Sequence, residues 1–289
     1  MYTVFQIVFP IFAIVLVGYL YARRHGPDMA AANKVNLEIF TPALIFSVLA
    51  GKDFHPAEYT DLAMAGIVVV LGSGLIAWPI ARILGYSNKM FLPPMMFNNS
   101  GNMGLPLALF AFGEAALPAA MVLFLVENTL HFSVGNAMLI GRLSLIKLLT
   151  NPMLVATLLG MLVAFTKTAL PDPLLEAIKL LGQIAIPLML FSLGVRMTEV
   201  DLSDWKLGFL GGLLCPLSGI LAALLVTQWV VLPEQQLAML LVFATLPPAV
   251  LNYIMAEHYN IESERVAAVV MTGNMLSLVT IPLALYWVL

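Results

Sequence analysis

The chain has 289 residues, of which 61% are hydrophobic and 10% are charged, and its mean hydropathy is +0.98. Soluble domains carry roughly 25% charged residues, so this composition excludes a soluble monomer and predicts an all-α polytopic membrane protein. The net charge of −3 and the lack of a basic tract exclude a nucleic-acid partner, and the single Cys215 excludes a disulfide framework.

Ten membrane-spanning helices are predicted, because a spanning helix needs about 20 mostly apolar residues. Eight of the predicted spans contain no charged residue, and two contain acidic residues. The first span is expected to stay uncleaved, since it lacks a basic n-region and outruns the apolar core of a signal peptide. In chain order the predicted spans are Tyr2–Ala22, Asn33–Gly51, Leu62–Ala81, Met90–Gly113, Ala115–Ile140, Leu148–Thr166, Leu180–Val195, Leu207–Pro233, Gln235–Ala256 and Val266–Leu289.

The distribution of Lys and Arg predicts the orientation, because cytoplasmic loops of membrane proteins are enriched in both. If both termini face outward, the outer loops hold only Lys52, Lys167 and Lys179, and the other ten of the 13 basic residues are cytoplasmic. The expected location is therefore the plasma membrane, the inner membrane of a bacterium, with both termini outward. The cytoplasmic basic residues are Arg23, Arg24, Lys34, Arg82, Lys89, Arg142, Lys147, Arg196, Lys206 and Arg265.

Motifs recur at an interval of about 145 residues. PALIFS at Pro42 returns as PLMLFS at Pro187, and SGLIA at Ser73 returns as SGILA at Ser218. Each half holds five predicted spans, and an odd number forces the second copy to enter the membrane from the opposite side. The sequence therefore predicts two inverted five-helix repeats, a pattern typical of secondary transporters. The expected division is 1–141 for the first repeat, 142–150 for an interfacial linker and 151–289 for the second repeat.

Predicted spans four and nine are both unsuited to a continuous helix. Span four contains NNSGNMGLP and span nine contains ATLPPAVLN, at matching places in the two repeats. Unwound backbone at membrane depth is tolerated only inside protein or at a cavity, so the two breaks are expected to cross near the membrane centre. The residues expected to interrupt these helices are Gly101, Gly104, Pro106, Pro247 and Pro248.

A break of this kind predicts an anion site, because half-helix N-termini present unpaired N–H groups and a positive dipole end. Side-chain amides and hydroxyls near the breaks would add hydrogen bonds. The residues expected to bind the substrate are Asn98, Asn99, Ser100, Asn102, Thr245 and Asn252, with Asn128 and Asn274 as equivalent second-line contacts.

NSGNMGLPL in span four, PPAVLN in span nine and TPALIFS in span two resemble the auxin efflux carrier family over essentially the whole chain. That family includes plant auxin exporters and prokaryotic carriers assigned to malate, malonate and related carboxylates. The resemblance implies crossed helices four and nine, a scaffold of helices 1, 2, 6 and 7 that often forms a homodimer, and a transport domain of helices 3–5 and 8–10. The long central loop of many plant members is missing, which favours the compact prokaryotic type.

Ionisable residues inside apolar spans are costly and are expected to be paired or functional. Glu127 and His131 are four residues apart in span five, so they share a helix face and could carry a proton. Glu38 lies near the middle of span two, where it could couple to protons or anchor a neighbouring helix. Proton or sodium coupling thus remains open at this point.

The function predicted from the sequence is a secondary transporter that moves a small organic anion by alternating access, with export favoured. The alternative is a sodium-coupled symporter of the bile-acid transporter type. That type usually places an acidic residue or Gln within the span-nine break, and Leu246–Ile254 contains neither. An enzyme is not expected, since no nucleophile and base or metal motif occurs, and no catalytic residue, cofactor or metal site is predicted.

Overall fold

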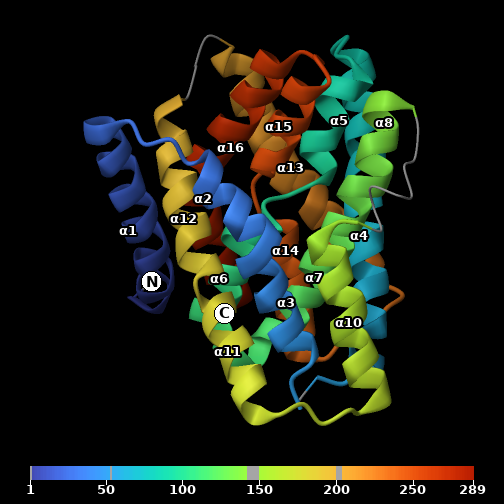
Figure 1. Ribbon diagram of the computed structural model, residues 1–289. Coiled ribbons are helices and arrows are strands. Elements are labelled where there is room, and N and C mark those ends of the chain that lie inside the picture. The colour runs from blue at the N-terminus through green and yellow to red at the C-terminus, as the bar shows by residue number, and fades with distance from the viewer. Residues whose placement is uncertain (1, 53, 142–149, 200–203) are drawn as a thin grey trace.

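The computed structural model describes residues 2–52, 54–141, 150–199 and 204–289, and these fold as a bundle of helices (Figure 1). Within these ranges the only β-type pairing is one isolated antiparallel bridge, between Asn98 and Pro248. The expected interfacial linker lies outside the described residues, apart from Thr150. In chain order the helices are α1 (Tyr2–His25), α2 (Ala30–Val35), α3 (Thr41–Leu49), α4 (Thr60–Ile83), α5 (Asn88–Met96), α6 (Leu105–Phe112), α7 (Leu117–Leu130), α8 (Asn136–Ile140), α10 (Pro152–Thr166), α11 (Asp172–Gln183), α12 (Ala185–Arg196), α13 (Trp205–Val226), α14 (Glu234–Ala244), α15 (Val250–His258) and α16 (Ser263–Val288).

Several of these helices continue into one another through short segments of different pitch. Three of the segments in the described ranges are π-helical: η1 (Asn36–Phe40), η3 (Ser100–Gly104) and η5 (His131–Gly135). Three others are 3₁₀-helical: η2 (Pro56–Tyr59), η4 (Glu114–Ala116) and η6 (Met197–Glu199). A π-turn adds a residue to the helical repeat and is frequent at functional sites.

Six helical stretches in the described ranges are long and apolar enough to cross a membrane, which fits a multi-pass membrane protein. The other predicted spans are interrupted or short. Span two consists of α2, η1 and α3, spans four and nine are broken in the middle, and α10 has 15 residues. The six stretches are Tyr2–His25, Pro56–Ile83, Glu114–Ile140, Asp172–Arg196, Trp205–Val226 and Ser263–Val288.

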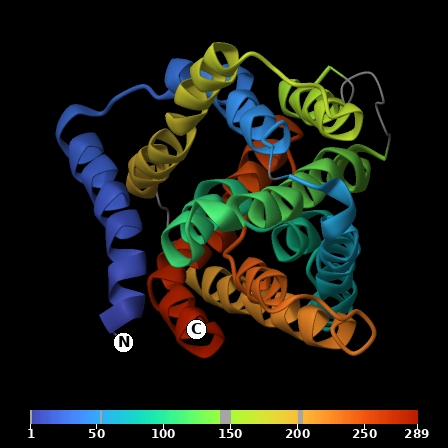
Figure 2. The ribbon, with the colours of Figure 1, turned by 90° about the horizontal axis from the view of Figure 1, so that it is seen from below.

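The helices pack as two groups (Figure 2). In the first group α1 packs against α12, and α3 packs against α10 and α11. In the second group α13 packs against α4 and α16, α4 packs against α5 and α7, and α15 packs against α16. Figure 2 shows α1, α12, α3 and α10 curving around one side of the second group. Both views place the two chain ends near each other (Figures 1 and 2).

Glycine allows α1 and α12 to approach backbone to backbone. A Cβ atom at Gly18 would lie 2.2 Å from the carbonyl oxygen of Phe191, and one at Gly194 would lie 1.9 Å from that of Val15. No other residue fits at these positions without moving a helix. Small residues of this kind are the usual means of close helix packing in membranes.

The repeated SGLIA and SGILA motifs perform equivalent roles in the second group. Ser73 and Ser218 each donate a hydrogen bond to the carbonyl three residues back in their own helix. The adjacent glycines, Gly74 and Gly219, each face the helix that ends at a break: a Cβ atom would lie 2.6 Å from the Met96 side chain or 2.2 Å from Ala244 O. The recurrence of the motif thus reflects the same packing contact in both halves of the chain.

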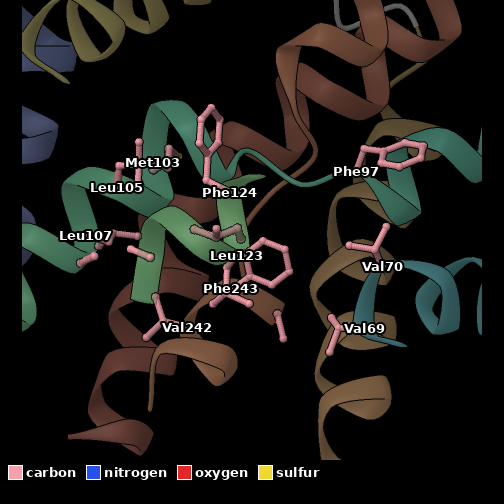
Figure 3. Close-up of a cluster of buried hydrophobic side chains, with 14 of the residues drawn as sticks. Val69, Val70, Phe97, Met103, Leu105, Leu107, Leu123, Phe124, Val242 and Phe243 are labelled. Atoms are coloured by element: carbon pink, nitrogen blue, oxygen red, sulfur yellow. The ribbon is translucent and has the colours of Figure 1, made fainter. Parts of the chain in front are cut away.

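A cluster of buried apolar side chains includes Phe97 of the first break (Figure 3). Its labelled members come from α4, α6, α7, α14, η3 and the first break, and all are at least 94% buried. These side chains hold the interrupted segments in place without using polar groups. The labelled members are Val69, Val70, Phe97, Met103, Leu105, Leu107, Leu123, Phe124, Val242 and Phe243.

Candidate functional site

Both predicted helix breaks are present. The first spans residues 97–99, between α5 and η3, and the second spans residues 245–249, between α14 and α15. Pro247 and Pro248 lie inside the second break, as expected. Gly101, Gly104 and Pro106 do not lie inside the first: the glycines are within η3, and Pro106 is in the first turn of α6. All three residues lie in the half-helix that follows the break, so the prediction that they interrupt the helix was wrong: the interruption precedes them, at residues 97–99.

The two breaks contact each other directly. The Asn99 N–H donates to Pro247 O at 2.7 Å, and the Ala249 N–H donates to Phe97 O at 2.9 Å, which forms the antiparallel bridge. The Asn252 side chain donates to the same Phe97 carbonyl at 2.8 Å. These peptide groups, which the sequence led us to expect as solute contacts, are therefore paired across the crossing.

Two further amides tie the crossing to its neighbours. Asn98 Nδ2 donates to Phe243 O at 2.7 Å, which satisfies a carbonyl in the last turn of α14. Asn99 Nδ2 donates to Asn274 Oδ1 at 2.9 Å, and Asn274 Nδ2 donates to Pro248 O at 3.0 Å. A chain of hydrogen bonds thus runs from the first break through α16 to the second break.

A buried pair of a glutamate and a histidine lies beside the first break. Glu127 Oε2 accepts a hydrogen bond from Ser100 Oγ at 2.9 Å, and Glu127 Oε1 is 3.2 Å from His131 Nδ1. The His131 ring stacks on Phe97, with 4.2 Å between ring centroids and 8° between planes. Both Glu127 and His131 are at least 97% buried. The pair therefore contacts both ends of the first break, Phe97 and Ser100.

A cavity of about 170 Å³ lies between the crossing and the first helix group. One side, here called the crossover wall, includes seven of the predicted residues: Asn98, Asn99, Gly101, Asn102, Glu127, Asn128 and His131. The opposite side, here called the scaffold wall, is formed by Asn33, Asn36, Leu37, Thr41, Met153, Met189, Ser192, Leu193 and Arg196.

Two half-helix N-termini border this cavity. The helix formed by η3 and α6 begins at Ser100, and Asn99, Gly101 and Asn102 line the cavity. Helix α15 begins at Val250, which also lines it. The first N–H groups of a helix have no intrahelical partner and attract anions, so the cavity is suited to a carboxylate.

The predicted residues differ in whether they reach the cavity. Asn102 lines it, and its side chain makes no hydrogen bond to the described part of the chain; Asn128 lines it and donates to Met153 Sδ at 3.3 Å. Asn252, Asn274, Ser100 and Thr245 are buried behind the wall, and Glu38 is exposed on the outer surface of η1. The residues expected to contact substrate thus separate into cavity-lining and supporting sets.

Sequence analysis missed the polar residues of the scaffold wall. Asn33, Asn36, Thr41, Ser192 and Arg196 all line the cavity. Thr41 precedes PALIFS and Ser192 ends PLMLFS, so the repeated motifs themselves contained the signal. Ser and Thr in helices usually bond to their own backbone, which made these residues unremarkable in the sequence. Among the described residues, no three His, Cys, Asp or Glu side chains are placed to hold a metal ion.

A second cavity, of about 730 Å³, lies toward the other end of the molecule. It is lined by parts of α3, α6, α11, η4 and the start of α12, which occupy the lower part of Figure 1, whereas α2 and α15 are in the upper part. Its lining includes Leu44 and Ser47, which are the repeat equivalents, 145 residues earlier, of Met189 and Ser192 in the first cavity.

Interrupted apolar helices, a polar crossing and a cavity beside it define a polytopic membrane transporter. A family model described as membrane transport protein, the family of the auxin efflux carriers, matches residues 135–285, and the chain belongs to this family. It is a transporter and not an enzyme. It is 27% identical to a Rhizobium meliloti protein named "Putative malonate transporter", over 97% of this chain and 94% of that protein. It is 26% identical to an "Uncharacterized transporter" of Methanothermobacter thermautotrophicus, over 96% of each chain.

Proposed function

We propose that the chain is a secondary transporter that exports a small carboxylate across the bacterial inner membrane by alternating access. The observation that carries this proposal is the cavity bordered by two half-helix N-termini and by the amides of the first break. Each helix dipole contributes only about 0.3–1 kcal/mol to the binding of a carboxylate, and weak binding suits a carrier that must release its cargo.

Matched packing in the two halves supports ten spans in two inverted repeats, 1–141 and 151–289. The contact of α1 with α12 corresponds to that of α10 with α3, and the contact of α4 with α7 corresponds to that of α13 with α16. In this arrangement α1–α3 and α10–α12 form the scaffold, through which two copies would associate, and the remaining helices form the transport domain. Cavities toward opposite ends of the molecule are consistent with a path to each side of the membrane, which alternating access opens in turn.

The positions of basic residues support a cytoplasmic opening for the first cavity. Arg196 lines it at the end of α12, and Arg23 and Arg24 end α1, whereas the second cavity lies at the end that carries Lys179. The positive-inside rule then places both termini outside.

The buried Glu127–His131 pair supports proton coupling. It lines the cavity and contacts the first break through both Ser100 and Phe97, so gain or loss of a proton would alter the site that holds the anion. Glu38 lies outside the cavity, on an exposed surface, and we assign it no part in coupling.

Counterflow in proteoliposomes tests this proposal. Vesicles loaded with unlabelled malonate should accumulate labelled malonate only when they contain the protein. Replacement of sodium by choline should leave the exchange unchanged. Exchange that requires sodium would favour the sodium-symporter alternative, and absence of exchange with malonate, malate and indole acids would refute carboxylate transport.

A further inference from the structure

The second cavity is bordered by a helix whose polar side chains face inward. Glu176, Lys179 and Gln183 of α11 line this cavity, whereas Leu174 and Leu180 of the same helix are exposed on the molecular surface and do not line it. Charged side chains in a membrane span are costly in lipid and usually face a water-filled cavity. The orientation of α11 therefore indicates that the second cavity contains water and admits ions.

Two carboxylates and one ammonium group line this cavity. Glu114 Oε2 is 4.0 Å from Lys179 Nζ, and these side chains are 75% and 46% exposed. Glu114 belongs to η4, which packs against α7 of the second helix group, so the ion pair connects that group to α11 of the first group. Glu176 lies three residues before Lys179 on α11. An anion in this cavity thus meets a lysine that already has a carboxylate partner, with another carboxylate beside it.

The first cavity has a different balance of charge. Arg196 lines it at the end of α12. In the described part of the chain, the acidic residue that lines it is Glu127, which accepts a hydrogen bond from Ser100 and lies 3.2 Å from His131. The carboxylate at the first cavity is therefore buried and bonded to its neighbours, whereas those at the second cavity act on whatever enters it.

The fold itself does not require the acidic residues of the second cavity. The repeat equivalent of Glu176, 145 residues earlier, is Ala31, and the equivalent of Glu114, 145 residues later, is Tyr259. Neither is acidic. The two glutamates are therefore specific to the second cavity and are not a by-product of the duplicated fold.

We propose that Glu114 and Glu176 make the second cavity an exit that releases the transported anion and disfavours its return. Glu114 pairs with Lys179 and so keeps the lysine from binding the departing carboxylate, and Glu176 adds a like charge. This inference rests on the proposed carboxylate transport and on the proposed orientation, in which the second cavity opens to the outside. These charges do not drive export, because they leave the equilibrium distribution of the anion unchanged. They lower the affinity for the anion on one side of the membrane.

The expected effect on affinity is modest and depends on salt. Both partners of the ion pair are partly exposed, and an exposed pair changes an equilibrium by a factor of about five at most. Exposed charges are also screened over about 10 Å at 0.1 M ionic strength. Salt should therefore weaken the effect of the two glutamates on malonate entering from the outside.

The test measures exchange of labelled malonate in right-side-out and everted membrane vesicles, which present the outer and the inner face to the medium. Glu114→Gln and Glu176→Gln should each lower the KM for malonate roughly two- to fivefold, in right-side-out vesicles only. About 0.5 M potassium chloride should remove most of this difference from the wild type. The matched control is Asp172→Asn, since Asp172 is an exposed acidic residue of α11 that does not line the cavity, and it should leave both KM values unchanged.

A double variant separates masking of Lys179 from simple repulsion. If Glu114 acts by occupying the lysine, Glu114→Gln should no longer lower the outer KM when Lys179 is also replaced by Gln. An equal decrease in the presence and absence of Lys179 would overturn the masking of the lysine by Glu114.

The remaining outcomes distinguish this inference from the proposed function. Outer KM values that stay at the wild-type level in both Glu variants would overturn the exit while leaving carboxylate transport intact. A decrease in everted vesicles, alone or to the same extent, would overturn it too, because the effect would not belong to the outer face. Lack of malonate exchange by the wild type in either kind of vesicle would instead contradict the proposed function.

Discussion

The two helix breaks are alike in backbone and different in chemistry. Both interrupt a helix at the crossing, and each supplies hydrogen bonds to the other. The first break and the η3 turn that follows it place Asn99 and Asn102 at the cavity, and Ser100 donates a hydrogen bond to Glu127. At the second break the Thr245 hydroxyl donates to Val242 O in its own helix, and Asn252, in the first turn of α15, donates to Phe97 O. Matching breaks therefore need not share one chemistry: we infer that side chains at the first break bind the substrate, whereas the second contributes the N-terminus of α15 and otherwise supports the crossing.

The largest effect is expected from Asn102→Ala. Loss of a hydrogen bond to a carboxylate costs about 1.5–3 kcal/mol, so malonate exchange should fall roughly 10- to 100-fold. The melting temperature should not change, because the Asn102 side chain bonds to nothing else in the described structure. The matched variant at the second break is Asn252→Ala. It should lower the free energy of unfolding by about 1 kcal/mol, because it removes the hydrogen bond to Phe97 O. If Asn252→Ala abolishes exchange at wild-type stability, the proposed division of roles is wrong.

A smaller effect, on stability, should distinguish the packing behind the two breaks. A Cβ atom at Gly219 would meet the Ala244 carbonyl at 2.2 Å, whereas one at Gly74 would meet the flexible Met96 side chain at 2.6 Å. We expect Gly219→Ala to destabilise the protein by about 1–3 kcal/mol and Gly74→Ala by clearly less, because only Met96 can move aside. Thermal unfolding in detergent measures both, and equal melting temperatures would contradict the described packing.

Glu127→Gln should change the pH dependence of exchange more than its maximal rate. Gln retains the shape of Glu and can still accept the Ser100 hydrogen bond, but it cannot take up a proton. Wild-type exchange should vary with pH, and the variant should lose the part of that variation that requires a proton on Glu127. A variant that keeps the wild-type pH profile would exclude Glu127 as the proton carrier.

The smallest effect is expected far from both breaks. Lys52 and Asp172 form an ion pair of 3.7 Å in which both side chains are more than 80% exposed. Exposed pairs contribute about 0–1 kcal/mol, so Lys52→Gln should leave stability and exchange within error of the wild type. A marked loss of exchange would mean that the loops that hold Lys52 and Asp172 take part in transport.

The sequence predicted the breaks because their residue types disfavour a helix. Pro247 and Pro248 remove two backbone donors, and the amide-rich segment near Asn98 is unsuited to a span. The exact interruption in span four could not be placed, since it depends on pairing with Pro247 and Ala249, which are about 150 residues away. Gly101 and Gly104 do mark an irregular segment, but it is a π-helical turn and not a break in the helix.

The scaffold wall could not be predicted for a different reason. A π-turn is a shift in backbone register, and residues 36–40 have no composition that distinguishes them from an ordinary helix. Whether Ser192 and Ser47 bond to their own backbone depends on local geometry and not on residue type. Glu38 attracted attention as a charge in an apolar span, yet it lies on an exposed face away from the cavity.

The antiparallel bridge between the breaks limits how this protein can change shape. Straightening or unwinding either segment alone would separate Asn99 from Pro247 and Ala249 from Phe97. Their peptide groups would then be buried in an apolar interior without hydrogen-bond partners, which is costly. In the alternating-access cycle that we propose, the joined segments therefore move as one rigid body along the surface that faces the α1–α12 pair.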